Sequence, residues 1–311
     1  MKKRGIVLKS TGSLYIVKPE DSPRITCSLK GNFRIKGIKS TNPVAVGDYV
    51  VVEIQEQHEI AIITEVLERK NCIVRQATNL SKRTHLIAVN IDCVYIIVSL
   101  KQPCIPLGFI DRYLVAAESY FIPAKIIFNK IDMYDKKAEI LLNQYNEIYS
   151  SIGYSCLETS AVKGDGIAEL KEMLKGKVNL FSGQSGVGKS SLINRLQPEL
   201  DLKTASVSLF NEKGKHATTY AEMFETEGGY IIDTPGLRGF ELIDFTKDEI
   251  SLFFPEMKAL SPHCHFYNCT HTHEPDCAIK LALEKGEIAQ SRYMNYLMML
   301  ESHQENYKKD K

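Results

Sequence analysis

The loop at residues 183–190 constrains the fold of this chain more than any other feature. It reads Gly-Gln-Ser-Gly-Val-Gly-Lys-Ser, follows the apolar run Val178–Phe181 and opens the helical pattern Ser191–Leu196. A strand, a glycine-rich turn and a helix in this order are typical of a phosphate-binding loop, in which backbone N–H groups surround the phosphates. Lys189 is then expected to reach the outer phosphates and Ser190 to bind Mg²⁺. The residues predicted to contact the phosphates are Gly183, Gln184, Ser185, Gly186, Val187, Gly188, Lys189, Ser190 and Ser191.

A base-reading motif stands earlier in the chain than this loop. The stretch Asn129-Lys130-Ile131-Asp132 follows one apolar run of strand type, and Ser160-Ala161 follows the next. The carboxylate of Asp132 can accept hydrogen bonds from N1–H and the N2 amine of guanine, groups that adenine lacks, which disfavours an ATP-dependent enzyme. The backbone of Ser160 and Ala161 is expected beside guanine O6. Because parallel strands end at one edge of a sheet, we expect these residues and the phosphate loop to form one site for GTP and GDP.

The order of these motifs is exchanged relative to an ordinary GTPase, in which the phosphate loop precedes the switch segments and the base reader. From residue 91 onward, continuous apolar strands alternate with helical patterns, which predicts a parallel sheet covered on both faces. The sequence therefore predicts an α/β P-loop GTPase domain that is circularly permuted.

Two segments after the phosphate loop carry residues that would respond to the γ-phosphate. The turn Asp233-Thr234-Pro235-Gly236 ends a predicted strand, so its aspartate is expected to hold Mg²⁺ through water and its glycine N–H to sense the γ-phosphate. Between the phosphate loop and this turn, Thr218, or failing that Thr219, would close on Mg²⁺ and the γ-phosphate. The predicted magnesium ligands are Ser190, Thr218 and Asp233, and the predicted contacts of the second segment are Asp233 and Gly236.

Activation of the attacking water is the open chemical question. Many GTPases place a glutamine after the second switch turn to orient water, whereas this chain has Leu237, which cannot hydrogen-bond. The nearest side chain able to orient or deprotonate water is His216, and the alternative is that this histidine has no chemical role. We therefore expect slow intrinsic hydrolysis, with His216, Thr218 and Lys189 as the candidate catalytic residues.

The cysteines divide into scattered and clustered sets. Of the eight, Cys264, Cys269 and Cys277 lie within 14 residues near the C-terminus, close to four histidines. Thiolates with an imidazole suit tetrahedral Zn²⁺, and four protein ligands would make a closed, structural site for one ion. Spacing alone leaves the fourth ligand open among His263, His265, His271 and His273.

The N-terminal segment differs from the rest of the chain in charge. The whole chain carries 39 Lys+Arg against 38 Asp+Glu, but residues 1–39 hold ten Lys/Arg against two acidic residues, a local charge of 10 − 2 = +8. Five short β-type runs within residues 1–68 predict a small barrel of the OB type, although an SH3-like barrel would look similar. A basic face on such a barrel favours RNA binding, and a solvated basic face is the plainer alternative.

The composition and the motifs together predict three domains. The expected boundaries are residues 1–68 for the barrel, 69–90 for a linker, 91–240 for the permuted GTPase domain and 241–311 for a mainly helical zinc-binding domain. No N-terminal stretch resembles a signal peptide and no apolar run is long enough for a membrane span. We expect a cytoplasmic protein, without a membrane partner, that acts as a monomer.

Taken together, these motifs resemble the circularly permuted ribosome-small-subunit-dependent GTPase family along almost the whole chain. The resemblance rests on Asn-Lys-x-Asp placed before Gly-x-Ser-Gly-Val-Gly-Lys-Ser-Ser, on Asp-Thr-Pro-Gly followed by an apolar residue, and on Cys-x4-Cys-x-His-x5-Cys. It implies His271 as the fourth zinc ligand, His216 as the catalytic histidine and Thr218 as the switch threonine, although Ala217 stands where the family often has Thr.

The resemblance also implies GTP hydrolysis stimulated by the small ribosomal subunit, with its rRNA as partner, during late maturation. The alternative is a nucleotide-regulated rRNA-binding protein whose turnover is incidental. Because the last switch turn leads directly into the zinc-binding segment, loss of the γ-phosphate is expected to move that domain.

Overall fold

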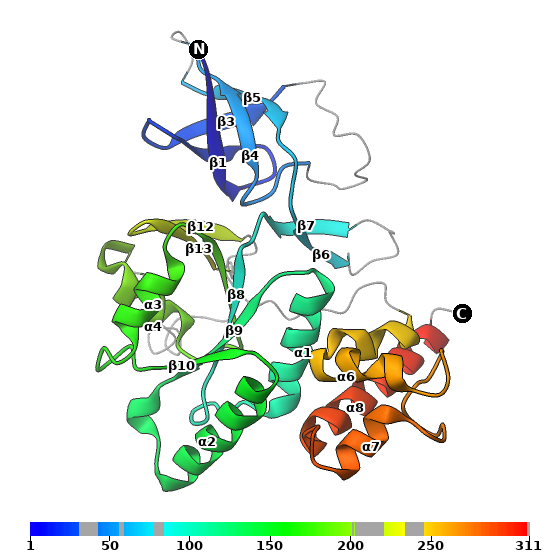
Figure 1. Cartoon of the computed structure of the whole chain (residues 1–311). Helices are drawn as coiled ribbons and strands as arrows, with labels where there is room; N and C mark the ends of the chain where they lie inside the picture. The colour runs from blue at the N-terminus through cyan, green and yellow to red at the C-terminus, as the bar shows by residue number, and fades with distance from the viewer. Residues whose placement is uncertain are drawn as a thin grey trace.

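The structure is a computed structural model that describes residues 1–30, 43–55, 59–76, 84–200, 202, 221–233 and 246–309. An N-terminal barrel stands at one end of a central sheet with helices around it, and a C-terminal helical domain lies beside helix α1 (Figure 1). Within the part of the chain that the structure describes, no helix has both the length and the apolar character to cross a membrane.

The N-terminal domain is a closed barrel of five strands. Strand β1 pairs with both β2 and β4, so the order β1-β2-β3-β5-β4 returns to its start, as in an OB-fold. Alternate residues of β2 are buried, the period expected of strands with one face on a core. The predicted barrel is thus confirmed, and its strands are β1 (Lys2–Ser10), β2 (Tyr15–Pro19), β3 (Ile25–Leu29), β4 (Tyr49–Glu53) and β5 (Ala61–Val66).

The segment predicted as a linker, residues 69–90, contains a two-stranded sheet of β6 (Cys72–Gln76) and β7 (Thr84–Val89). The end of strand β7 is hydrogen-bonded to the barrel. Val89 N–H donates to the Val46 carbonyl at 3.0 Å, and the Asn90 side chain donates to the Gly47 carbonyl at 3.0 Å. Gly47 has φ +93, and a side chain there would collide with the Val89 backbone, so only glycine allows this close approach.

The central sheet has the order β10-β9-β8-β11-β13-β12, with every neighbouring pair parallel except β12–β13. Its inner strands are buried along their whole length, because helices cover them, which agrees with the continuous apolar runs in the sequence. The strands are β8 (Cys93–Val98), β9 (Ala124–Asn129), β10 (Ser155–Thr159), β11 (Val178–Ser182), β12 (Glu222–Thr226) and β13 (Gly229–Asp233). The helices are α1 (Leu107–Ser119), α2 (Lys136–Ser151), α3 (Ile167–Leu174) and α4 (Lys189–Leu196), together with the 3₁₀ turns η1 (Ile131–Met133) and η2 (Pro198–Leu200).

The C-terminal domain is helical, as predicted, and has its own apolar core. That core includes Phe254, Met257 and Tyr296, and it also takes in Val115 from α1 of the GTPase domain. A capping box, in which the side chains of Thr246 and Glu249 satisfy each other's backbone N–H groups, starts the domain. Its elements are η3 (Lys247–Phe253), α6 (Pro255–Leu260), η4 (Ser261–His263), α7 (Ala278–Glu284) and α8 (Gln290–Lys309).

Candidate guanine-nucleotide site and metal centre

The phosphate loop joins β11 to α4, as its sequence predicts. Gly183, Gly186 and Gly188 all have positive φ, at +152, +87 and +95. A side chain at Gly183 would collide with the carbonyl of Ile97, and one at Gly188 with the amide of Asn129. Close packing therefore requires glycine at positions 183 and 188, in addition to the positive φ at both. The loop leaves backbone N–H groups at the start of α4, where a helix N-terminus favours anions.

The base reader lies directly against this loop. Asn129 ends β9 and is 1% exposed; its side-chain amide donates to the Val187 carbonyl at 2.9 Å. Its amide oxygen accepts a hydrogen bond from the Thr159 hydroxyl at 3.0 Å. One buried side chain therefore ties the ends of β9 and β10 to the phosphate loop, and the two motifs that the permutation separates in sequence form one edge of the sheet.

The carboxylate that would read guanine is held in place by a neighbour. The Ser160 hydroxyl is buried and donates to Asp132 Oδ1 at 2.6 Å, while it accepts from the Lys163 N–H at 3.0 Å. Lys130 has φ 65, and its ammonium donates to the Gln102 carbonyl at 2.7 Å. Burial lowers the pKa of Lys130, while Asp132 opposes the shift. Ser160 therefore holds Oδ1 of Asp132 beside the end of β10.

The ends of β11 and β13 also converge. The Lys189 ammonium donates to the carbonyls of Gly183 and Gln184 at 2.7 and 2.9 Å. Burial lowers the pKa of Lys189, and the nearby Asp233 carboxylate works against that shift. Lys189, Ser190 and Asp233 thus come from the two adjacent parallel strand ends. A serine hydroxyl and a carboxylate are hard oxygen donors that suit Mg²⁺.

Several predicted residues cannot be placed. His216, Thr218, Thr219, Gly236 and Leu237 lie outside the described residues. The structure also adds two supports that sequence reasoning did not single out, the Thr159 hydroxyl on Asn129 and the Gln102 carbonyl on Lys130. Thr159 adjoins the predicted Ser160, which was an available signal, whereas no pattern marks Gln102.

A Cys₃His cluster occupies the C-terminal domain. The ligand atoms of Cys264, Cys269, His271 and Cys277 all lie within 4.8 Å of one another. His271 Nδ1 is 3.7 Å from the Cys264 sulfur and 3.5 Å from the Cys277 sulfur, and these two sulfurs are 4.0 Å apart. Zn–S bonds of about 2.3 Å and Zn–N bonds of about 2.0 Å in a tetrahedron require separations of roughly 3.5 to 3.8 Å. The cluster therefore fits a zinc site.

His271 is the histidine that lies among the three cysteines. His271 is buried, whereas His263, His265 and His273 are exposed. The Tyr293 hydroxyl donates to the His271 carbonyl at 2.6 Å, which fixes a residue whose φ of 58 is unusual for histidine. The choice of His271 over its three neighbours agrees with this geometry.

The loop that carries His271 is braced by a carboxylate. Glu274 accepts hydrogen bonds from the Thr270 N–H and hydroxyl at 2.7 and 2.6 Å and from the Thr272 N–H at 3.0 Å. Burial works to raise the pKa of Glu274, but these hydrogen bonds outweigh it and lower the pKa to about 2. The carboxylate thus stays ionised and holds the loop between the second and third ligands.

A buried ionic network, which the sequence did not predict, joins the C-terminal domain to the GTPase domain. Arg292 of α8 donates to Asp111 of α1 at 2.8 Å and to both oxygens of Glu256 of α6 at 2.8 and 3.1 Å. Asp111 also accepts from Tyr149 of α2 at 2.7 Å and from Asn295 at 2.5 Å. The guanidinium lies 4.5 Å from the centre of the Phe254 ring, within cation–π range. Five polar side chains from two domains therefore satisfy one another at the interface.

Two family models match the chain, one after the other. A model described as RsgA GTPase matches residues 66–243, and a model described as RsgA N-terminal domain matches residues 4–63. A Bacteroides fragilis protein named small ribosomal subunit biogenesis GTPase RsgA is 49% identical over 303 residues, which is 97% of each chain. A Flavobacterium johnsoniae protein of the same name is 50% identical over 309 residues, covering 98% of this chain and 95% of the relative.

Solved structures agree in overall architecture. YjeQ from Thermotoga maritima aligns with a TM-score of 0.79 and 36% identity, covering 97% of this chain and 98% of the other. A structure described as YloQ, a circularly permuted GTPase, aligns with a TM-score of 0.77 and 31% identity, covering 98% of this chain and 96% of the other. The likeness thus extends over the barrel, the permuted sheet and the Cys/His domain together.

Proposed function

This chain belongs to the RsgA family of GTPases, and from that premise we propose that it hydrolyses GTP during the late maturation of the small ribosomal subunit. We propose that the small subunit stimulates this hydrolysis. The observation that carries the proposal is the contact of Asn129 with the phosphate loop, because it brings the guanine reader and the phosphate cradle to one edge of the sheet. We also expect a monomer, and a partner that matures in the cytoplasm implies that location.

Different residues of the chain would bind the guanine base, the phosphates and Mg²⁺. Asp132, oriented by Ser160, would accept from guanine N1–H and N2, and the backbone of Ser160 and Ala161 would contact O6. The backbone of residues 183–191 surrounds the phosphates, and Lys189 moves from the loop carbonyls to the β- and γ-oxygens when they arrive. Ser190 and Asp233, with Thr218, would hold Mg²⁺, which supplies charge neutralisation at the β- and γ-oxygens.

Hydrolysis would depend on residues outside the described part of the chain. His216 is proposed to orient the attacking water, since Leu237 cannot, and Gly236 to contact the γ-phosphate. Low intrinsic turnover follows if docking on the subunit is needed to order His216 and Thr218. The zinc cluster would hold one structural Zn²⁺ through Cys264, Cys269, Cys277 and His271.

The barrel and the zinc domain are proposed to contact rRNA. The described barrel carries Lys2, Lys3, Arg4, Lys9, Lys18, Arg24 and Lys30, a density of cations that suits phosphates. GTP hydrolysis measured with and without purified small subunits tests the proposal, with large subunits as the control. Stimulation by small subunits alone is the expected result. Tight GTP binding with no stimulation would instead favour a nucleotide-regulated RNA-binding protein.

A further inference from the structure

The β12–β13 hairpin connects the two segments that are predicted to respond to GTP. It joins segment 203–220, which contains His216 and Thr218, to segment 234–245, which contains Gly236. Strand β12 begins four residues after Thr218, and β13 ends at Asp233, three residues before Gly236. Any displacement of this hairpin, here named the switch hairpin, therefore moves the anchor points of both segments that would respond to GTP.

The outer edge of the switch hairpin is held by the barrel. Strand β12 pairs with β1 through Lys9 and Glu222, and the Lys9 ammonium also reaches the Glu222 carboxylate at 3.0 Å. Arg24 donates twice to Glu225 Oε2, at 2.9 and 3.1 Å, and Lys18 lies 4.0 Å from Glu225 Oε1. Three cations of the barrel thus act on two carboxylates of one strand. We call these five side chains the latch.

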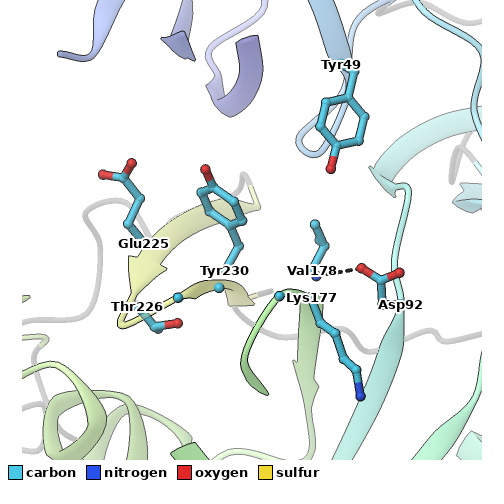
Figure 2. Close-up of a pocket in the computed structure, with 10 residues that line it drawn as sticks. Tyr49, Asp92, Lys177, Val178, Glu225, Thr226 and Tyr230 are labelled. Carbon is cyan, nitrogen blue, oxygen red and sulfur yellow. Dashed lines mark hydrogen bonds between the residues drawn. The ribbon is translucent and has the colours of Figure 1, made fainter. Parts of the chain in front are cut away.

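The latch is the weak part of the barrel's attachment. Its side chains are 29–48% exposed, and pairs of this kind are individually weak and screened by salt. Beside it, the two parts do not pack closely. A cavity of about 370 Å³ lies between Tyr49 of the barrel and a floor formed by Thr226, Tyr230 and Val178 (Figure 2). Apart from the cavity, Ile6 and Leu8 of β1 belong to the same buried apolar cluster as Met223 of β12, and opening of the exposed ion pairs does not require the loss of that cluster.

A second attachment keeps the barrel in place when the latch opens. The buried Asp48 accepts from Arg69 at 2.6 and 2.7 Å, and Val46 and Gly47 are hydrogen-bonded to Val89 and Asn90. These contacts follow the chain connection between the two domains. Opening the latch therefore loosens the outer edge of the switch hairpin without releasing the barrel from the GTPase domain.

The cations of the latch have two possible partners. Lys9, Lys18 and Arg24 belong to the same basic segment that would neutralise RNA phosphates, and a phosphate that takes one of them leaves Glu222 or Glu225 unpaired. We propose that the latch holds the switch hairpin against the barrel in the free protein and restrains GTP hydrolysis, and that phosphates of an RNA partner release it by competing for the barrel cations. The inference rests on the proposed function for the identity of that RNA. It assigns Glu222 and Glu225 as positioning residues that act through the segments they anchor.

The test removes the carboxylates, because changing the cations would also alter RNA binding. The double variant Glu222→Gln/Glu225→Gln is compared with wild type for GTP turnover without subunits, with saturating small subunits, and at low and high salt. Basal turnover is expected to rise on the order of threefold, and the stimulation factor to fall correspondingly. Basal turnover of wild type should rise with salt as the latch is screened, whereas that of the variant should respond much less. A purely structural role of the two glutamates would not produce this loss of salt dependence.

Two further variants keep the result interpretable. Glu227 lies in the turn of the same hairpin, and its carboxylate faces Lys171 of α3 instead of the barrel. The variant Glu227→Gln should therefore have the basal turnover of wild type. The exchanged pair Lys9→Glu/Glu222→Lys keeps an ion pair between the same two positions with its signs reversed, so its basal rate should stay low. Unchanged or lower basal turnover in the double variant would overturn the latch. A wild type that small subunits do not stimulate, together with a faster double variant, would refute the proposed partner and leave the latch standing.

Discussion

Replacement of Arg292 by methionine should separate the C-terminal domain from the GTPase domain. The Arg292 side chain is 1% exposed, and its partners Asp111 and Glu256 are 0% and 7% exposed. Methionine fills most of the volume but leaves two buried carboxylates without their cation. Breaking a buried ionic network from one side costs about 3–5 kcal/mol, because the remaining charge is not solvated. The interface between α1, α6 and α8 should therefore open far more often than in wild type.

The loss of interface stability in Arg292→Met should also depend on pH. Burial raises the pKa of Asp111 above its usual value, and Arg292, Asn295 and Tyr149 work to lower it. Without Arg292 the pKa rises further, so the folded variant binds a proton more tightly than the unfolded chain does. Such a group stabilises the fold below its unfolded pKa and loses that contribution as pH rises through the folded pKa. The deficit of Arg292→Met relative to wild type should thus be larger near pH 8 than near pH 5.

Hydrogen exchange of the amides of α8 and α1 measures this opening directly. An interface weakened by about 3–5 kcal/mol should exchange on the order of 10² to 10⁴ times faster, while strands of the barrel stay as in wild type. The triple variant Arg292→Met/Asp111→Asn/Glu256→Gln removes the uncompensated charges and should recover most of the protection. Equal protection in wild type and Arg292→Met, at both pH values, would refute the account of the network.

Three other changes test the nucleotide and metal sites. Ser160→Ala removes a hydrogen bond to the charged Asp132 and should weaken GDP binding roughly 10- to 100-fold, measured with a fluorescent analogue; unchanged affinity would show that the carboxylate needs no support. Asp132→Asn replaces an acceptor by a donor, so kcat/KM should shift from GTP toward xanthosine triphosphate, and retained guanine preference would remove Asp132 from base reading. Cys277→Ser should abolish stoichiometric zinc in the purified protein and loosen α7 while GTP affinity is kept; a zinc content equal to that of wild type would contradict the ligand assignment.

The sequence predicted the nucleotide site well because each of its motifs carries its own geometry. A glycine-rich loop between a strand and a helix has few possible shapes, and parallel strands bring their ends to one edge, so Asp132 and Lys189 could be placed together although 57 positions separate them (189 − 132). The strand predicted at Val178–Phe181 and the helix predicted at Ser191–Leu196 were found within two residues of their expected ends. The barrel followed from five short runs of strand type within residues 1–68.

The ionic network was not predictable in the same way. Asp111 and Arg292 are 181 positions apart, and each lies on a helix where a charged residue usually faces solvent. Only tertiary packing brings α1 and α8 together and turns two ordinary charges into a buried pair. The two-stranded sheet at residues 69–90 was missed because the basic residues beside its strands, Arg69, Lys70, Lys82 and Arg83, suggested a linker.

The two interdomain contacts suggest which part of the molecule responds to nucleotide. The order of motifs led us to expect that loss of the γ-phosphate moves the zinc domain, because its chain continues directly from the second switch segment. That domain, however, is fixed to α1 and α2 by a buried network whose disruption costs several kcal/mol. The barrel meets the switch hairpin through the β1–β12 pairing and through exposed ion pairs beside a cavity, and ordinary salt or an RNA phosphate can break those ion pairs. A nucleotide-dependent change should therefore be expressed first between the switch hairpin and the barrel, with the zinc domain and the base-reading side of the sheet moving as one body.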